Sequence, residues 1–258
     1  MKGIIVLKCG GSTMQQLPDR FFTNISALQK NGYQPIIVHG GGPAIQEMLN
    51  RLQIKSEFVD GLRKTSKQAM DVVEMVLTGK INNDIANRVN RTGLQAIGIC
   101  GTDANLLTAK PKDFERYGYV GEVTNVNVTF LKKIINSGVV PVIAPVAISE
   151  DGERYNINAD TAAGAVAKAM QAEQLIFVTD VPGIMNNDRL LKCVTDEEIE
   201  QMITEGTIHG GMIPKVKAAV QCLSEDLQEV LIVDGQQAYP VERKEFAGTI
   251  IKKSVGVV

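Results

Sequence analysis

The stretch PIIVHGGGP, residues 35–43, joins a short apolar run to three glycines and a proline. A run this rich in isoleucine and valine is typical of a strand buried on both faces, and proline is tolerated in the first turn of a helix. Glycines at a helix start leave backbone amides open to an anion. A tight turn alone needs only one glycine, so the segment predicts a strand, an anion-binding turn and a helix.

The same alternation on both sides of this stretch predicts an α/β fold, with a mainly parallel sheet covered by helices. Strand-like runs lie at residues 4–7, 35–39, 96–99, 139–144, 175–179 and 229–233. Segments 106–123 and 148–157 alternate polar and apolar residues around turn signals, which predicts antiparallel hairpins that could cover a site. Capping boxes at Thr65 and Thr195 predict helix starts.

Composition excludes several classes of protein. With 44% hydrophobic and 22% charged residues, the 258-residue chain can bury a core. A net charge of -2 gives no basic field, so we expect no nucleic-acid partner. The four cysteines form no C-x-x-C pair and are interpreted as reduced core thiols. No apolar stretch approaches membrane-spanning length, so we expect a cytoplasmic protein without a membrane partner.

Two lobes would have to share one sheet, because no repeat, low-complexity tract or linker interrupts the chain. We expect the boundary near residues 171–174. It would separate an N-terminal lobe, residues 1–172, from a C-terminal lobe, residues 173–258.

Two further glycine-rich loops carry a lysine. Lys8 ends the first apolar run and precedes Gly10 and Gly11, where a buried ammonium would need a counter-charge. An ammonium that reaches solvent from a strand end is the equally open alternative. Gly210 and Gly211 lead into a helix with Lys215 in its first turn, where the helix dipole disfavours a cation unless an anion is bound.

Three polar segments lie close to the predicted loops. Asn158 and Asp160 fit a helix cap and a first-turn acid, which leaves Asn156 unexplained. Arg63 precedes a helix cap and is either a bidentate carboxylate clamp or an ordinary surface arginine. Residues 179–184 form a turn where a purine or ribose could rest, or a plain turn.

Common catalytic motifs are missing from the sequence. It has neither the G-x-x-x-x-G-K-[ST] phosphate loop nor the G-x-G-x-x-G dinucleotide motif after a strand, and no G-x-S-x-G elbow. Only His39 and His209 are present, which excludes a histidine-rich metal site, and we assign His39 no chemistry. Catalysis would therefore depend on lysines and backbone amides.

Taken together and in order, these segments resemble the amino-acid kinase family over nearly the whole chain. The segments that carry the resemblance are Lys8-Cys9-Gly10-Gly11, His39-Gly40-Gly41-Gly42-Pro43, Gly61-Leu62-Arg63, Asn156-x-Asn158-x-Asp160, Thr179-Asp180-Val181-x-Gly183 and Gly210-Gly211-Met212-Ile213-x-Lys215. The resemblance implies a three-layer αβα sandwich, an N-terminal lobe for an acyl amino acid, a C-terminal lobe for ATP with Mg²⁺, and a homodimer.

The resemblance also implies a substrate, because Arg63 and Asn156 stand where the family holds the carboxylate of N-acetyl-L-glutamate. The implied reaction is ATP-dependent phosphorylation of its side-chain carboxylate, a step of arginine biosynthesis. Kinases for N-acetyl- or carrier-linked L-aminoadipate remain alternatives, since one methylene changes binding by only about 1–3 kcal/mol. A non-catalytic sensor of ATP or an amino acid is the alternative from another class.

The implied catalytic residues are Lys8 and Lys215, on opposite sides of the transferring phosphoryl group, and Asp160, which would hold both lysines. Mg²⁺ would travel on ATP, so no residue is assigned to metal. The implied substrate-binding residues are Gly41, Gly42, Arg63 and Asn156. The implied ATP-binding residues are Gly10, Gly11, Thr179, Asp180, Gly183, Ile184, Gly210 and Gly211.

The resemblance finally bears on regulation. Arginine-inhibited members of the family carry an extra N-terminal helix that links dimers into a hexameric ring, whereas the first predicted strand here begins at about Gly3. We therefore expect a dimer that is insensitive to arginine. A pocket formed by residues 248–258 alone is the competing interpretation.

Overall fold

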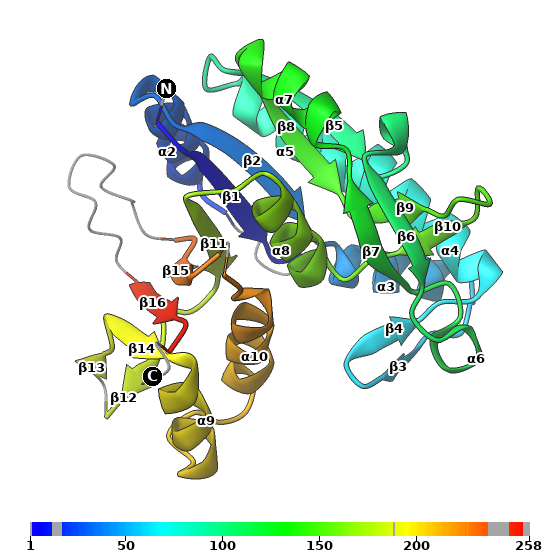
Figure 1. The fold of residues 1–258 in the computed structure, drawn as a ribbon. Coiled ribbons are helices and arrows are strands. Elements are labelled where there is room, and N and C mark those ends of the chain that lie inside the picture. Colours follow the sequence, from blue (N-terminus) through cyan, green and yellow to red (C-terminus); the bar gives the residue numbers. More distant parts are fainter. Residues whose placement is uncertain (1, 12–16, 188, 226, 237–247, 255–258) are drawn as a thin grey trace.

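An eight-stranded sheet runs through the molecule (Figure 1). The computed structural model describes residues 2–11, 17–187, 189–225, 227–236 and 248–254. Neighbouring strands of the sheet are parallel except β15 and β16. In order across the sheet, the strands are β14 (Cys193–Thr195), β16 (Gly248–Lys252), β15 (Glu229–Asp234), β11 (Gln174–Thr179), β1 (Ile4–Cys9), β2 (Gln34–His39), β8 (Val139–Ala144) and β5 (Gln95–Cys100).

All six strands predicted from apolar runs lie in this sheet, as β1, β2, β5, β8, β11 and β15. The prediction missed β14 and β16. β14 has only three residues, and the apolar pair Ile250 and Ile251 of β16 is flanked by Thr249 and Lys252, so neither strand shows the long apolar run of a buried parallel strand.

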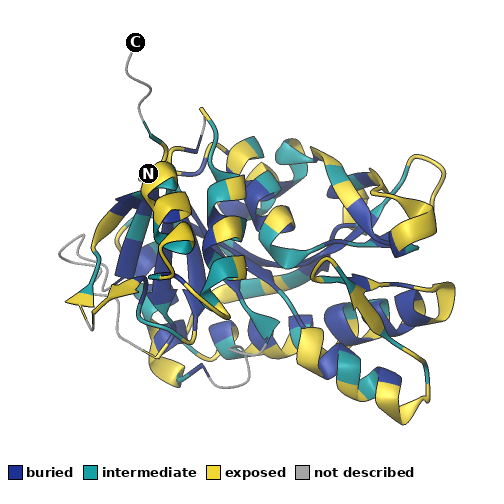
Figure 2. Ribbon diagram, turned by 90° about the horizontal axis from the view of Figure 1, so that it is seen from below, coloured by how far each residue is buried: buried dark blue, intermediate teal, exposed yellow. Residues whose placement is uncertain are grey.

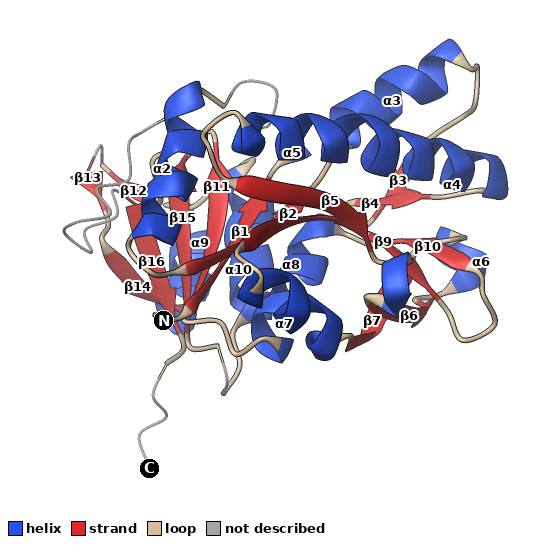
Figure 3. Cartoon of the chain, turned by 90° about the horizontal axis from the view of Figure 1, so that it is seen from above, coloured by secondary structure: helices blue, strands red, loops and turns tan. Residues whose placement is uncertain are grey.

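Helices cover both faces of the sheet, which makes a three-layer αβα sandwich and confirms the predicted fold class (Figure 3). One face carries α2 (Asp19–Lys30), α3 (Gly42–Arg51), α4 (Lys67–Glu74), the π-helical segment η1 (Met75–Ile81) and α5 (Asn82–Asn90). The other carries α7 (Val128–Asn136), α8 (Ala159–Ala169), α9 (Asp196–Thr204) and α10 (Met212–Cys222).

The central strands are buried on both faces (Figure 2). In β1, Ile5 and Leu7 pack into the core beneath α2 and α5, whereas Val6 packs into the core beneath α8. Successive side chains of a strand point to opposite faces, so one apolar run supplies both cores. This explains why such runs predicted the sheet correctly.

Smaller β-elements extend from the carboxyl ends of β8 and β2, on the side where α3 begins (Figure 1). The predicted antiparallel hairpins are confirmed as the pairs β6–β7 and β9–β10 of one four-stranded sheet. The strands of this region are β3 (Glu57–Val59), β4 (Leu62–Lys64), β6 (Leu107–Pro111), β7 (Gly121–Val126), β9 (Val146–Ile148) and β10 (Arg154–Asn156), with the short helices η2 (Asp103–Asn105) and α6 (Phe114–Tyr117). A separate hairpin, β12 (Met185–Asn186) and β13 (Arg189–Leu190), follows β11.

Helix starts follow the predicted caps closely. Thr195 and Glu198 form the expected capping box at α9. At α4 the cap is Ser66, one residue later than predicted, and its Oγ accepts a hydrogen bond from Ala69 N. Within the described residues, none of the helices has the length and apolar character needed to cross a membrane.

The sheet is continuous across the expected lobe boundary. β1 and β11, which lie on either side of residue 172 in sequence, pair in parallel from Ile5 with Gln174 to Cys9 with Val178. The two halves of the chain therefore share one sheet, as expected, and their division into lobes stays a prediction.

A polar pair, His39 and Asn82, is buried where β2 ends. Asn82 Nδ2 lies 3.0 Å from His39 Nε2, and His39 Nδ1 lies 3.0 Å from the carbonyl oxygen of Gly40. Burial lowers the pKa of His39 to about 4. The imidazole is therefore neutral in the folded protein at neutral pH.

We expect this histidine to make the protein less stable in mild acid. The unfolded chain takes up a proton near pH 6.5, whereas folded His39 does so only near pH 4, so the free energy of unfolding falls across this range by about 3 kcal/mol. Urea titrations of wild type and His39→Gln at several pH values measure the free energy of unfolding as a function of pH. The free energy of unfolding of the variant should lose this part of its pH dependence. If the free energies of both proteins fell in parallel with pH, the prediction would be wrong.

Candidate active site

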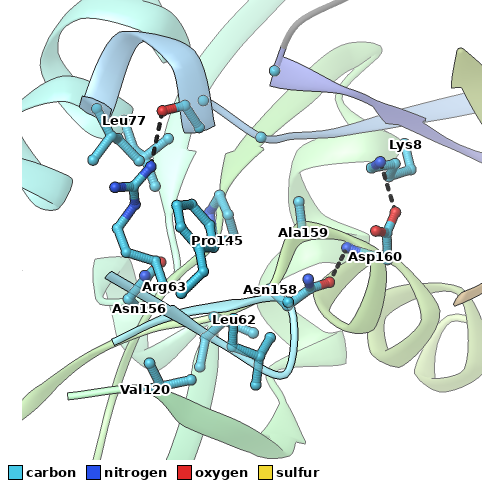
Figure 4. A pocket seen from close by; sticks show the side chains of 18 residues that line it. Lys8, Leu62, Arg63, Leu77, Val120, Pro145, Asn156, Asn158, Ala159 and Asp160 are labelled. Atoms are coloured by element: carbon cyan, nitrogen blue, oxygen red, sulfur yellow. Dashed lines mark hydrogen bonds and ion pairs between the residues drawn. The ribbon is translucent and has the colours of Figure 1, made fainter. Parts of the chain in front are cut away.

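A cavity of about 190 Å³ opens at the carboxyl ends of β1 and β2 (Figure 4). Open α/β sheets bind ligands at this edge. Its polar lining contains seven predicted site residues: Lys8, Gly11, Gly41, Gly42, Arg63, Asn156 and Asp160. They come from β1, the first two glycine loops, the β3–β4 hairpin, β10 and the start of α8, so the tertiary structure brings together residues up to 152 positions apart in sequence.

The first two glycine loops touch each other through their backbones. A Cβ on Gly11 would lie 2.6 Å from Gly41 N and 2.8 Å from Gly42 N, so residue 11 can carry no side chain without separating the loops. Gly42 begins α3, where amides lack partners within the helix. Among the described residues, no group accepts a hydrogen bond from Gly41 N or Gly42 N. Unpartnered amides at a helix start are suited to bind an anion.

Lys8 and Asp160 form an ion pair at the cavity wall. Lys8 Nζ lies 2.6 Å from Asp160 Oδ1, and only 14% of the lysine side chain is exposed. This rules out the alternative in which the ammonium reaches solvent. Asn158 Oδ1 caps α8 by accepting from Asp160 N at 2.8 Å, and Asp160 Oδ1 receives the ion pair but no hydrogen bond from the described residues.

Arg63 is a buried cation with neutral partners. It is 7% exposed, and its guanidinium donates to Gln46 Oε1 at 2.6 Å, to Ser56 Oγ, and to the carbonyl oxygen of Gly42 at 3.1 Å. Burial lowers its pKa. No carboxylate of the described chain forms an ion pair with it. Because a buried charge needs compensation, Arg63 is suited to bind an anion in the cavity.

Asn156 is tied to Arg63 through Thr65. Asn156 Nδ2 donates to Thr65 Oγ1 at 3.1 Å, and Thr65 Oγ1 donates to the carbonyl oxygen of Arg63 at 2.7 Å. Thr65 is fully buried. The contact holds the strand of Arg63 against the strand of Asn156, on one wall of the cavity (Figure 4).

Lys215 lies apart from this cavity, and its partner differs from the expected one. Its Nζ is 2.5 Å from Asp180 Oδ1, a contact that holds the pKa of the Asp180 carboxyl below its usual value. The structure thus joins Asp160 to Lys8 and gives Lys215 a different carboxylate. Asp180 directly follows β11, and its carboxylate contacts Lys215 near the start of α10.

The remaining predicted ATP residues mainly shape turns. Thr179 Oγ1 is bonded to the backbone of Val233 at 3.2 Å. A Cβ on Gly183 would lie 2.5 Å from Thr249 Oγ1, which also accepts from buried Ile184 N at 2.8 Å. Gly10 does not line the cavity. Gly210 and Gly211 precede α10, where an added Cβ would meet nothing within 4 Å, so this helix start is open.

A sequence model described as the amino acid kinase family matches residues 3–234. The chain belongs to the amino acid kinase family. Acetylglutamate kinase from Geobacillus sp. (strain WCH70) is 51% identical over 98% of both chains, and acetylglutamate kinase from Halalkalibacterium halodurans is 48% identical over 99% of this chain and 98% of its own. The family predicted from the motifs is confirmed.

Solved structures share this amino acid kinase fold. The smu.665 protein of Streptococcus mutans UA159 is 33% identical, with a TM-score of 0.85 over 98% of this chain and 99% of its own. N-acetylglutamate synthase from Neisseria gonorrhoeae, complexed with coenzyme A and N-acetyl-glutamate, is 20% identical, with a TM-score of 0.83 over 98% of this chain and 60% of its own. The second likeness concerns the fold alone.

The sequence motifs of this amino acid kinase do not include the apolar residues that line the cavity. These lining residues are Ile45, Phe58, Leu62, Leu77, Val120, Pro145 and Ile157. They are scattered over several elements and resemble ordinary core residues, so no local pattern could single them out. Phe58 also stacks on Arg63, with the guanidinium carbon 4.6 Å from the ring centroid.

We expect Gly11→Ala to abolish most activity, because its methyl group would meet backbone that cannot move aside. A displacement of about 1 Å in a catalytic site costs on the order of 10²-fold in rate. Gly79→Ala is the matched control, since a Cβ there meets nothing within 4 Å. Steady-state kinetics should show near-wild-type rates for the control, and equal rates for both variants would contradict the proposed contact between the loops.

Proposed function

We propose that this chain transfers the γ-phosphoryl group of ATP to the side-chain carboxylate of N-acetyl-L-glutamate, giving N-acetyl-L-glutamyl 5-phosphate and ADP in arginine biosynthesis. The observation that carries the proposal is the single cavity that holds a buried arginine at one end and a lysine with free glycine amides at the other. The near-full-length relatives named acetylglutamate kinase support this choice of substrate.

The Arg63 end of the cavity fits the acyl amino acid. Arg63 can give a fork of charge-assisted hydrogen bonds to the α-carboxylate, and Asn156 lies on the same wall. Apolar side chains, among them Leu62 and Val120, offer a place for the acetyl methyl group. The side-chain carboxylate would then point toward the amides of Gly41 and Gly42.

The Lys8 end fits the transferring phosphoryl group. Transfer between two anions depends on positioning and on neutralising charge, and the Asp160 ion pair holds the Lys8 ammonium at this wall. We assign Lys215 to the opposite side of the phosphoryl group. For this role its ammonium would exchange Asp180 for phosphate oxygens. Both lysines would act chiefly in the transition state.

ATP would lie along the C-terminal half of the sheet. The loop after β11, with Thr179, Asp180, Gly183 and Ile184, would frame the base and ribose, and the open start of α10 at Gly210 and Gly211 would face the phosphates. The described residues include no cluster of three or more histidine, cysteine or acidic side chains able to hold a metal. Mg²⁺ would bind mainly to the phosphates and water.

A homodimer belongs to the same proposal. β5 is an edge strand of the large sheet and exposes Ile97 to 45%, which is a surface suited to pairing with a second copy. The cytoplasmic location expected from the sequence stays a prediction.

The reaction is tested by trapping the acyl phosphate with hydroxylamine in the presence of MgATP. N-acetyl-L-glutamate should give a hydroxamate faster than N-acetyl-L-aminoadipate. Lys8→Ala and Lys215→Ala should each lower kcat roughly 10²- to 10³-fold and change KM much less. A faster reaction of the longer acid would favour the aminoadipate kinase. Absence of hydroxamate with any acylated acid would favour the sensor.

Arg63→Lys separates binding of the acyl amino acid from binding of ATP. Lysine keeps the positive charge but loses the planar fork, so we expect a higher KM for N-acetyl-L-glutamate and an unchanged KM for ATP. Initial rates with each substrate varied in turn measure both constants. A change in the KM for ATP alone would place Arg63 in the nucleotide site instead.

A further inference from the structure

A buried polar pair lies directly behind the Gly40-Gly41-Gly42 loop, and the proposed chemistry does not use it. His39 is fully buried, and Asn82 is 3% exposed. His39 ends β2, and Asn82 begins α5, 43 residues later. Because unpaired polar groups inside a protein are costly, the hydrogen bonds of this pair define its arrangement closely.

The amide of Asn82 has only one consistent orientation. Its Nδ2 lies 2.8 Å from the carbonyl oxygen of Val142 and 3.3 Å from that of Ile99. Carbonyl oxygens only accept hydrogen bonds, so the atom between them must be the donor nitrogen. The same nitrogen faces His39 Nε2 at 3.0 Å.

This orientation determines the tautomer of His39. A proton on Nε2 would point at the amide nitrogen of Asn82, which can only donate, so the proton of the neutral ring is on Nδ1. His39 Nδ1 then donates to the carbonyl oxygen of Gly40 at 3.0 Å. The tautomer that makes this hydrogen bond is therefore selected by Asn82.

The hydrogen bond to Gly40 orients the next amide. The carbonyl of Gly40 and the N–H of Gly41 belong to one trans peptide plane and point in opposite directions. With the carbonyl held toward the His39 ring, the Gly41 N–H points away from the ring. The bare Cα of Gly11 stands beside Gly41 N, at the cavity.

The π-helical segment η1, which ends just before Asn82, packs against Gly41. A Cβ on Gly41 would lie 2.5 Å from both Leu77 Cδ2 and Ile81 Cδ1, two side chains of the π-helical segment η1. From the opposite side, Gly98 in β5 leaves room for Asn82, since a Cβ there would lie 1.9 Å from Asn82 Oδ1. The position of Asn82 is thus defined by packing as well as by hydrogen bonds.

We propose that His39 and Asn82 are positioning residues which hold the Gly40–Gly41 peptide so that the Gly41 N–H faces the reacting carboxylate. Asn82 selects the tautomer, and the Nδ1–H of His39 holds the carbonyl of Gly40. This assignment deepens the proposed kinase function and rests on it. Neither His39 nor Asn82 is among the residues that line the cavity.

Nitrogen NMR of histidine tests the tautomer independently of activity. The chain has only two histidines, and His209 is exposed, so ¹⁵N-histidine labelling gives two rings, which His39→Asn assigns. At neutral pH the His39 ring should carry its proton on Nδ1, with Nε2 bare. A proton on Nε2 would overturn the proposal.

Two matched variants test the positioning role in the hydroxamate assay. Asparagine places an amide nitrogen where Nδ1 stands, so His39→Asn keeps a donor for the Gly40 carbonyl, whereas His39→Gln keeps only a polar group toward Asn82. We expect His39→Asn to retain most of the wild-type kcat and His39→Gln to lose up to about 100-fold. The KM for ATP should not change in either variant.

Thermal midpoints of both variants separate positioning from stability. If His39 only fills the core, the loss of kcat would follow the loss of thermal stability. Comparable kcat values in His39→Asn and His39→Gln, at equal loss of stability, would therefore overturn the proposal. Gly98→Ala, which displaces Asn82 from outside the cavity, should lower kcat in the same manner as His39→Gln. An inactive wild type would refute the kinase function, while the NMR result would still decide the tautomer.

Discussion

The site depends on one close approach, that of the backbone of Gly11 to the amides of Gly41 and Gly42. Parallel pairing of β1 with β2 brings the two loops to the same edge of the sheet, with Cys9 opposite His39. Any side chain at residue 11 would fill the space between the loops. Donors held by a rigid sheet require little reorganisation when an anion binds, which is the basis of electrostatic stabilisation in enzymes.

The three cations assigned to the site differ in their partners. Lys8 is paired with Asp160, and Lys215 with Asp180. Arg63 has only neutral partners among the described residues and is suited to take its anion from the substrate. A small acidic molecule with two carboxylates can therefore extend from the arginine to the glycine amides, which agrees with the proposed substrate.

Beneath the glycine loops, the buried polar pair His39 and Asn82 interrupts the apolar packing of the sheet. Asn82 bonds to carbonyls of two strands as well as to His39, so it connects the loop to β8 and β5. Rigid supporting contacts of this kind hold a binding group within the small tolerance that catalysis requires. The π-helical segment η1 packs on the same loop from the helical layer.

The sequence by itself determined the α/β class, six strands of the sheet and the family, because apolar periodicity and glycine turns are local signals. It also singled out Lys8, Arg63 and Asp160 as candidate site residues. Only the tertiary structure decided which charges pair, since the family resemblance implied Asp160 for both lysines, whereas Lys215 contacts Asp180. The apolar lining and the contact between His39 and Asn82 likewise join distant segments, and no local pattern records such contacts.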